Sequence, residues 1–274
     1  MTERPVGTDL TVTLENPRAD RIKKVHALTG RSARMKSGTF LAEGPQAVRE
    51  AVRYWPEYVR ELYVSPGAHA KNPEIHAEAL ARGIRVFVGT DDVLDAISAD
   101  AQGVLAVVGT REETLPDDMS FVVVCVDIRD PGNLGTIIRT ADAAGVDALI
   151  LAGDCVEATN PKVVRATAGS LFHVSVVKAA KAVTVISDLK DRGLLALAAA
   201  GGGSAPLVGA GSPRLSGDVA WVLGNEARGL PSDILDAADH AVQIPIFGNA
   251  ESLNVASAAA VVMYSTAFER QKLP

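Results

Sequence analysis

Three polar segments in the second half of the chain hold the residues best placed for chemistry, because each follows an apolar run predicted to be a strand. They read DPGNLGTIIR after FVVVCV, LGNEARGL after DVAWV, and FGNAESLN after HAVQIPI. In open parallel sheets, ligands collect at the carboxyl ends of the strands. A helix N-terminus adds free N–H groups, and a glycine lets a ligand approach the backbone closely. The three segments therefore predict one ligand-binding edge.

Each segment also has an interpretation that needs no ligand. Asn133 would cap a helix, and Arg139 would be a salt-bridged helix residue. The glycines around Glu226 and Arg228 would form a turn with an exposed ion pair, and Ser252 would cap the last helix. Turn chemistry alone does not explain why polar groups gather at three strand ends, so both interpretations stay open on the residues alone.

Several other chemistries lack their motifs. The chain has no G-x-x-x-x-G-K-[ST] phosphate loop, and its nearest approach to G-x-G-x-x-G, the segment GGGSAP, ends in Pro206 where the third glycine should be. No G-x-S-x-G nucleophile motif occurs. Histidine, cysteine and aspartate lack the spacing of metal ligands, so we predict no metal site and interpret His69 and His76 as surface residues.

The length of 274 residues predicts two domains. Hydrophobic residues make up 47% of the chain and charged residues 22%, which is ordinary for folded globular proteins. The acidic, proline-containing segment TREETLPDDMS, residues 110–120, lacks apolar periodicity and predicts the boundary. We expect the domains to span residues 15–109 and 119–274.

Both domains are predicted to be α/β. In the first, NPRADRIKKVHALTG and NPEIHAEALARG predict helices, and TFLAE, ELYVS, IRVFVG and VLAVVG predict strands. In the second, strands from FVVVCVDI, ALILAG, VSVVKA, LLALAAA, VAWVLG and HAVQIPI alternate with helices at 134–144, 161–170, 182–192, after Pro231, and at 252–270. This alternation predicts a doubly wound parallel sheet.

The cysteines and the N-terminal residues indicate the cellular compartment in which the protein is expected. Cys125 and Cys155 cannot form a disulfide framework, and Cys125 lies in an apolar run where a small buried residue is expected. The segment MTERPVGTDL lacks the apolar core of a signal peptide, and no apolar run approaches the roughly 20 residues of a membrane span. These features predict a cytoplasmic protein that does not enter a membrane.

A local run of positive charge contrasts with the net charge of −6. Between Asn16 and Phe40 the only acidic residue is Asp20. A solvated helix face explains such a run, and a phosphate-binding surface is the alternative. The basic residues of the run are Arg18, Arg21, Lys23, Lys24, Arg31, Arg34 and Lys36.

Together the three polar segments resemble the SpoU (TrmH-like) family of RNA ribose 2′-O-methyltransferases, within the SPOUT superfamily. The family's patterns N-x-G-x-x-x-R, G-N-E-x-x-G-[LM] and P-[IM]-x-G-x-x-x-S-L-N appear here in order as NLGTIIR, GNEARGL and PIFGNAESLN. The segment NPKVVRATAGSLFHVSV is also similar to the family's sequence. The resemblance is strong from Val122 onward. It is weaker from Asn16 to Val108, where KSGTFLAEG is similar to the family's RNA-binding domain of the L7Ae and L30 type.

The resemblance implies a parallel-sheet domain with a deep trefoil knot, in which the knotted loops bind S-adenosylmethionine largely through backbone groups. The loop at 199–201 is expected beside the cofactor. The implied cofactor-binding residues are Leu223, Gly224, Asn225, Ile244, Ile246, Ser252 and Leu253.

The resemblance also implies an active-site set. Because a guanidinium keeps its proton at any ordinary pH, we expect Arg139 to clamp the ribose or its phosphate rather than to act as a base. Glu226 and Asn254 would hold the shape of the site, and Ser252 would bond a phosphate. The proton acceptor stays open. The set comprises Asn133, Arg139, Glu226, Ser252 and Asn254.

The substrate implied by the resemblance is RNA. With this second indication, the basic run is expected to contact RNA phosphates, and Arg165 to reach RNA or a partner subunit. The family forms homodimers through its C-terminal helix, which agrees with the small-residue helix predicted after Ser252. The large N-terminal domain favours 23S ribosomal RNA. The alternatives are transfer RNA, a non-catalytic RNA-binding ribosome-assembly factor and, least favoured, a dinucleotide-dependent oxidoreductase.

Overall fold

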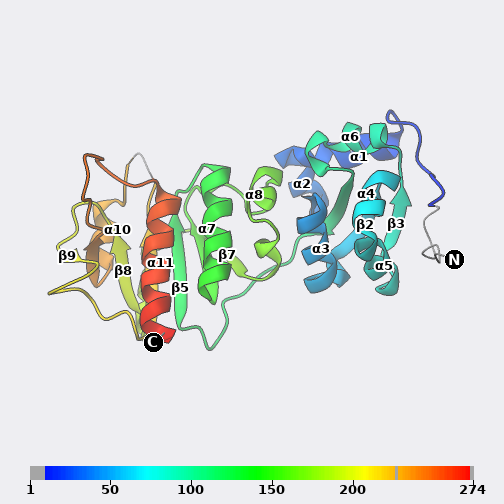
Figure 1. The fold of residues 1–274 in the computed structure, drawn as a ribbon. Helices are drawn as coiled ribbons and strands as arrows, with labels where there is room; N and C mark the ends of the chain where they lie inside the picture. The colour runs from blue at the N-terminus through cyan, green and yellow to red at the C-terminus, as the bar shows by residue number, and fades with distance from the viewer. Residues whose placement is uncertain (1–9, 226–227, 272–274) are drawn as a thin grey trace. The chain divides into compact units, whose positions relative to one another are not determined.

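The computed structural model describes residues 10–225 and 228–271 (Figure 1). Within these ranges the chain divides into two units. One combines the residues up to Arg111 with the later segment Thr159–Phe172, and the other combines Glu112–Ala158 with the residues from His173 onward. Residues 159–172, expected in the second domain, therefore pack in the first unit. No described helix is long and apolar enough to cross a bilayer.

The first unit is built on a four-stranded mixed sheet. Its strand order is β1-β4-β2-β3, with β4 antiparallel to both of its neighbours and β2 parallel to β3. The strands are β1 (Thr39–Glu43), β2 (Val59–Val64), β3 (Arg85–Val88) and β4 (Val104–Gly109). The helices are α1 (Asp20–His26), α2 (Arg31–Ser37), α3 (Pro45–Tyr54), α4 (Pro66–Lys71), α5 (Pro73–Ala81) and α6 (Asp91–Ile97), with short 3₁₀ turns at Ala27–Thr29, Pro56–Tyr58 and Ala99–Ala101.

The second unit contains a seven-stranded, all-parallel sheet of order β7-β6-β5-β10-β8-β11-β9. The strands are β5 (Phe121–Val126), β6 (Ala148–Ala152), β7 (Ser175–Ala179), β8 (Leu195–Ala199), β9 (Ala205–Pro206), β10 (Val219–Leu223) and β11 (His240–Gln243). The helices are α7 (Pro131–Ala144), α9 (Ala182–Asp191), α10 (Ser232–Ala237) and α11 (Val255–Gln271). The predicted parallel α/β sheet is confirmed. Strand order alone does not establish a trefoil knot, which stays a prediction.

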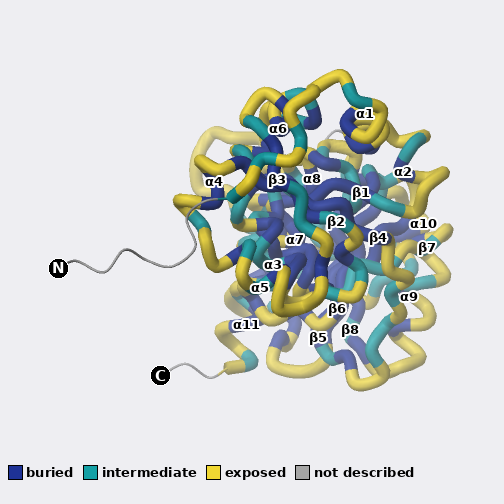
Figure 2. The backbone as a smooth tube through the Cα atoms, turned by 90° about the vertical axis from the view of Figure 1, so that its right-hand side faces the viewer, coloured by how far each residue is buried: buried dark blue, intermediate teal, exposed yellow. Residues whose placement is uncertain are grey.

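Helices cover both faces of the parallel sheet. On one face, alternate strand residues such as Val122 pack against Ile186 of α9 and Ile234 of α10. On the other, the indole N–H of the fully buried Trp221 in β10 donates to Thr266 Oγ1 of α11 over 2.8 Å. Helices α7 and α11 lie side by side (Figure 1), and the central strands are buried (Figure 2). Burial on both faces explains why β5 reads as an unbroken apolar run.

The segment Thr159–Phe172 joins the first unit through buried contacts. It holds α8 (Pro161–Ala166) and a 3₁₀ turn at Ser170–Phe172, where the sequence predicted one helix over 161–170. The Phe172 ring stacks on Phe40 and meets Trp55 edge to face, with centroids 6.4 and 5.2 Å apart. The helix ends early because Ala168 and Gly169 take positive φ angles, of 51° and 101°.

Arg165 secures the same segment. Its guanidinium pairs with Glu43, whose side chain is 1% exposed, and with Asp100 over 2.9 Å. Removing one partner of a buried pair leaves the other charge unpaired. We expect Arg165→Met to lower the free energy of unfolding by about 2 to 3 kcal/mol. This loss is smaller than that typical of a fully buried pair because the Arg165 side chain is partly exposed. Urea denaturation of the full chain measures this change.

Two variants calibrate the Arg165 measurement. Arg82→Met removes a partly exposed pair with Glu78, whose side chain is 26% exposed against 1% for Glu43, and should cost well under 1 kcal/mol. The double variant Glu43→Leu with Arg165→Met removes both charges and should regain stability over Arg165→Met alone. Equal losses for Arg165→Met and Arg82→Met would contradict the buried pair's role.

Candidate functional site

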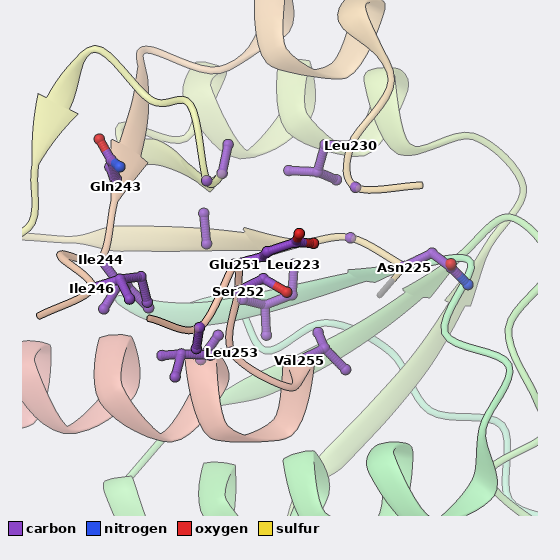
Figure 3. Close-up of a pocket in the computed structure, with 17 residues that line it drawn as sticks. Leu223, Asn225, Leu230, Gln243, Ile244, Ile246, Glu251, Ser252, Leu253 and Val255 are labelled. Atoms are coloured by element: carbon purple, nitrogen blue, oxygen red, sulfur yellow. The ribbon is translucent and has the colours of Figure 1, made fainter. Parts of the chain in front are cut away.

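A cavity of about 440 Å³ opens at the carboxyl ends of β8, β10 and β11 (Figure 3). Loops after these three strands, together with the segment leading into α11, form its walls. All seven residues predicted to bind the cofactor line it, and so does the predicted loop 199–201. The remaining lining residues are Gly229, Leu230, Gln243, Ala250, Glu251, Val255 and Ala258.

The walls of the cavity are mainly apolar. Leu223, Ile244, Ile246 and Leu253 contribute aliphatic side chains, while Ser252 supplies a hydroxyl group (Figure 3). Strand β11 ends at Gln243, whereas the sequence predicted a strand through residue 246. The residues that follow it are therefore loop residues, which lie beyond the parallel pairing of β11 with β8 and β9. Such a site suits a flat apolar group flanked by a few polar contacts.

Two backbone segments approach each other closely at Gly224, and this approach leaves no room for a side chain there. A Cβ placed on Gly224 would lie 2.8 Å from the carbonyl carbon and oxygen of Gly229 and 2.8 Å from Leu230 Cγ. The Gly229 N–H donates to the Asn225 carbonyl over 2.8 Å, and Gly229 has a φ of +65°. Gly224 and Gly229 thus lie close together at the cavity wall, as the turn interpretation also expected.

Asp127 connects two of the polar loops and was not predicted from the sequence. It has a φ of +54°, and its Oδ1 accepts the Asp154 N–H over 2.7 Å. Its carbonyl accepts a hydrogen bond of 3.0 Å from the side-chain amide of Asn225. Asp127 therefore holds the loop after β5 against the loop after β10. The only indication in the sequence was its position directly after an apolar strand.

Asn133 and Asn254 meet across the first turns of α7 and α11. The Asn254 amide donates to Asn133 Oδ1 over 3.0 Å, and Asn254 Oδ1 accepts the Ala256 N–H over 2.8 Å. Asn254 therefore caps α11, which corrects the cap role considered for Ser252; Ser252 lines the cavity instead. Likewise Asp130 Oδ1, accepting the Asn133 N–H over 2.7 Å, caps α7, so Asn133 is not the cap.

One predicted active-site residue, Arg139, stands apart from these contacts. Arg139 lies on α7 with its side chain exposed, and within residues 10–225 and 228–271 no hydrogen bond or ion pair engages its guanidinium. The salt-bridged interpretation of Arg139 therefore has no support in this part of the chain. Glu226 lies outside the described residues.

The predicted RNA-binding residues divide by their surroundings. Arg34 is 4% exposed and donates to the carbonyls of Leu28 and Thr29, so it is a structural residue and not a surface cation. Arg165 is held by Glu43 and Asp100.

In α1, two of the predicted RNA-binding cations are paired with carboxylates. Arg21 donates to Glu61 over 2.9 Å and lies over the Phe87 ring, and Lys23 lies 3.6 Å from Asp20. Arg18, Lys24, Arg31 and Lys36 are exposed.

The histidines do not form a metal site in the described residues, where no group of three or more His, Cys, Asp or Glu side chains is arranged around one point. The surface interpretation of His69 is wrong: it is 7% exposed, and its ring meets His76 edge to face with centroids 5.0 Å apart. Burial and the neighbouring His69 lower the pKa of His76.

Both parts of the chain match known protein families. Residues 120–264 match the SpoU rRNA Methylase family, and residues 19–106 match the MRM3-like substrate binding domain. The chain is 33% identical to the 23S rRNA (guanosine(2553)-2′-O)-methyltransferase RlmP of Bacillus subtilis over 92% of this chain and 97% of that protein.

Two solved structures are similar along nearly the whole chain. An AdoMet-bound rRNA methyltransferase from Sinorhizobium meliloti is 29% identical with a TM-score of 0.80, and the match covers 95% of this chain and 98% of that one. The SpoU methyltransferase AviRb from Streptomyces viridochromogenes, in complex with AdoMet, is 26% identical with a TM-score of 0.79, covering 93% and 100%. Since the family match spans more than half of the chain and the Bacillus relative exceeds 30% identity, the chain belongs to the SpoU rRNA Methylase family.

Proposed function

We propose that this protein transfers a methyl group from S-adenosylmethionine to a ribose 2′-hydroxyl of 23S ribosomal RNA. The observation that carries the proposal is the convergence of Leu223, Gly224, Asn225, Ile244, Ile246, Ser252 and Leu253 on one cavity at the carboxyl edge of the parallel sheet. Support for ribosomal RNA comes from the Bacillus relative, a 23S rRNA methyltransferase, which matches the chain across both units. Residues 15–109 would bind RNA and residues 119–274 would carry out methyl transfer.

The residues present fit the methyl donor. A cavity of about 440 Å³ lies within the range typical of small-molecule sites. Its aliphatic walls suit an adenine ring, and Gly224 brings bare backbone to the cavity surface. When bound, the donor supplies a methyl group already activated on a sulfonium, so the protein needs no strong nucleophile.

The protein's own residues would then position the ribose and lower the activation barrier for methyl transfer. The exposed guanidinium of Arg139 is available to clamp the ribose or its phosphate, and its positive charge would lower the pKa of the attacking hydroxyl. The Asn254–Asn133 hydrogen bond fixes the first turns of α7 and α11 against each other. Alignment of this kind is a large contribution when two bound groups must react in line. We further propose that Ser252 bonds a phosphate and that Glu226 supports the arrangement.

The test is to map 2′-O-methyl groups in ribosomal and transfer RNA from cells with and without the gene. The proposal expects one position of 23S rRNA to lose its methyl group and to regain it when the gene is restored. Loss from a transfer RNA would favour the alternative substrate. Titration calorimetry with S-adenosylmethionine separates an enzyme from a non-catalytic assembly factor, which would bind no methyl donor.

We also propose that the protein acts as a homodimer through α11. Val261, Tyr264 and Phe268 are 38, 37 and 57% exposed and recur at i, i+3 and i+7, which places them on one helix face. The Tyr264 and Phe268 rings contact each other at 5.6 Å between centroids. Aromatic residues in an exposed apolar stripe are typical of an interface.

The double variant Tyr264→Asp with Phe268→Asp should convert a dimer into monomers, because it would bury charge at the proposed interface. Sedimentation equilibrium at micromolar concentrations measures the mass. Val183→Asp alters a similarly exposed apolar residue on α9 and should leave the dimer intact. A wild-type monomer, or a double variant that stays dimeric, would contradict the proposed interface.

A further inference from the structure

Among the described residues that line the cavity, Glu251 is the only one with a charged side chain. The others are apolar or carry neutral polar groups, as Asn225, Gln243 and Ser252 do. Glu251 is exposed, and within residues 10–225 and 228–271 no hydrogen bond or ion pair holds its carboxylate. Figure 3 shows its side chain directed into the space between the lining side chains. Neither binding an adenine ring nor positioning the ribose requires this carboxylate.

Glu251 lies on the short segment that leads from the cavity into α11. The next residue, Ser252, also lines the cavity, and Asn254 follows two residues later with its hydrogen bond to Asn133. The carboxylate is therefore carried by the same segment as two of the predicted active-site residues. This position favours a contact with the reacting end of the methyl donor rather than with its adenine ring, which suits the aliphatic walls.

Methyl transfer removes one positive charge from the molecule in the cavity. S-adenosylmethionine has a sulfonium, an ammonium and a carboxylate, so it carries one net positive charge near neutral pH. When the ribose oxygen bonds to the methyl carbon, the electron pair of the broken C–S bond stays on sulfur and the hydroxyl proton leaves to solvent. The product, S-adenosylhomocysteine, is a thioether without net charge. The two molecules therefore differ by one methyl group and one charge.

A carboxylate at this cavity can distinguish the two molecules by their charge. Opposite charges attract each other more strongly beside apolar walls of low dielectric constant than in bulk water. Leu223, Ile244 and Leu253 provide such walls, while solvent reaches Glu251 and screens part of its charge. A ligand with a net positive charge gains from this attraction, and the gain is modest because Glu251 is exposed.

Resting on the proposed function, we infer that Glu251 recognises the sulfonium charge of the donor and makes the cavity prefer S-adenosylmethionine to S-adenosylhomocysteine. The attraction is lost once the methyl group has been transferred, so the spent product leaves a site that favours a fresh donor. A carboxylate here could instead bind the ribose hydroxyls or the ammonium of the donor. The product retains both of these groups, so neither contact would create a preference for the donor.

The experiment measures the affinity of the whole protein for S-adenosylmethionine and for S-adenosylhomocysteine by titration calorimetry, without RNA. Glu251→Gln keeps the size of the side chain and removes its charge. We expect this variant to bind the donor about five- to tenfold more weakly and the product within about twofold of wild type. Glu251→Asp keeps the charge and should retain part of the preference. Glu112→Gln changes another exposed glutamate of the second unit, outside the cavity lining, and should alter neither affinity.

Ionic strength provides a second measurement that depends on the charge of Glu251. Because Glu251 is exposed, salt screens its attraction for the donor. Raising KCl from about 50 to about 500 mM should narrow the preference of the wild-type protein for the donor over the product. The preference of Glu251→Gln should change little over the same range. A purely structural role for Glu251 would not make the ratio of the two affinities depend on salt.

The two affinities distinguish the possible roles of Glu251. Equal weakening of both ligands in Glu251→Gln would show that the carboxylate holds a group that they share, and would overturn the inference. Unchanged affinity for both ligands would also overturn it, whether or not methyl transfer falls. Wild-type protein that binds the donor but methylates no position of 23S rRNA would refute the proposed function, while the two affinities would still decide the role of Glu251.

Discussion

Arg139→Ala should reduce methyl transfer by about a thousandfold or more while leaving S-adenosylmethionine affinity within a few-fold of wild type. Arg139 is not among the residues that line the cavity, so the donor should still bind. Its exposed guanidinium is instead available to the RNA ribose and phosphate, where developing charge on the attacking oxygen would be stabilised. Removing one preorganised donor from a reaction centre typically costs about 10² to 10³ in rate, and loss of substrate alignment adds to that.

Single-turnover transfer of labelled methyl groups, with calorimetry for the donor, separates the two effects of Arg139→Ala. Arg139→Lys keeps a positive charge but loses the planar fork, so it should recover only part of the rate. Thr136→Ala lies one turn earlier on α7, also exposed, and should leave the rate unchanged. If Arg139→Ala transfers methyl groups at the wild-type rate, or if its donor affinity falls as much as its rate, Arg139 is not part of the reaction centre.

The sequence predicted part of the cavity because strand ends are encoded locally: residues of LGNEARGL and FGNAESLN line it, whereas no residue of DPGNLGTIIR does. Unbroken apolar runs such as FVVVCV mark strands covered on both faces, and parallel strands bring their carboxyl ends to one edge. Gly224 could be identified from its position alone, but the reason for a glycine there could not: the backbone of Gly229, five residues later, approaches it closely. The prediction that these residues bind the methyl donor came from the resemblance rather than from periodicity.

Specific contacts, some local and some between distant residues, account for what the sequence did not predict. Arg34 reads as a surface helix residue in the sequence, but it is buried and donates to the nearby carbonyls of Leu28 and Thr29. The segment Thr159–Phe172 lies within the methyltransferase portion of the sequence, yet aromatic contacts place it in the first unit. Helix caps were assigned to the wrong residue twice, because Asp130 and Asn254 compete with nearby polar residues of equal capping strength.

Gly224→Ala should weaken S-adenosylmethionine binding by about ten- to a hundredfold, the second large effect expected. The added Cβ would lie 2.8 Å from backbone atoms of Gly229, and backbone cannot rotate aside as a flexible side chain can. The Gly229 backbone would therefore have to move, and Gly229 lines the cavity. Overpacking of this kind typically costs about 1 to 3 kcal/mol.

The control for Gly224→Ala is Gly217→Ala, in the loop before β10. Nothing lies within 4 Å of a Cβ placed on Gly217, and its φ is not positive, so alanine should be accepted there. Calorimetry gives the donor affinity of both variants, and thermal unfolding shows whether the fold persists. A Gly224→Ala protein that binds the donor as wild type does would mean that the Gly224–Gly229 approach does not shape the pocket. If affinity falls while Gly217→Ala binds normally, the close backbone approach is what forms the cavity wall, and LGNEARGL is more than a turn.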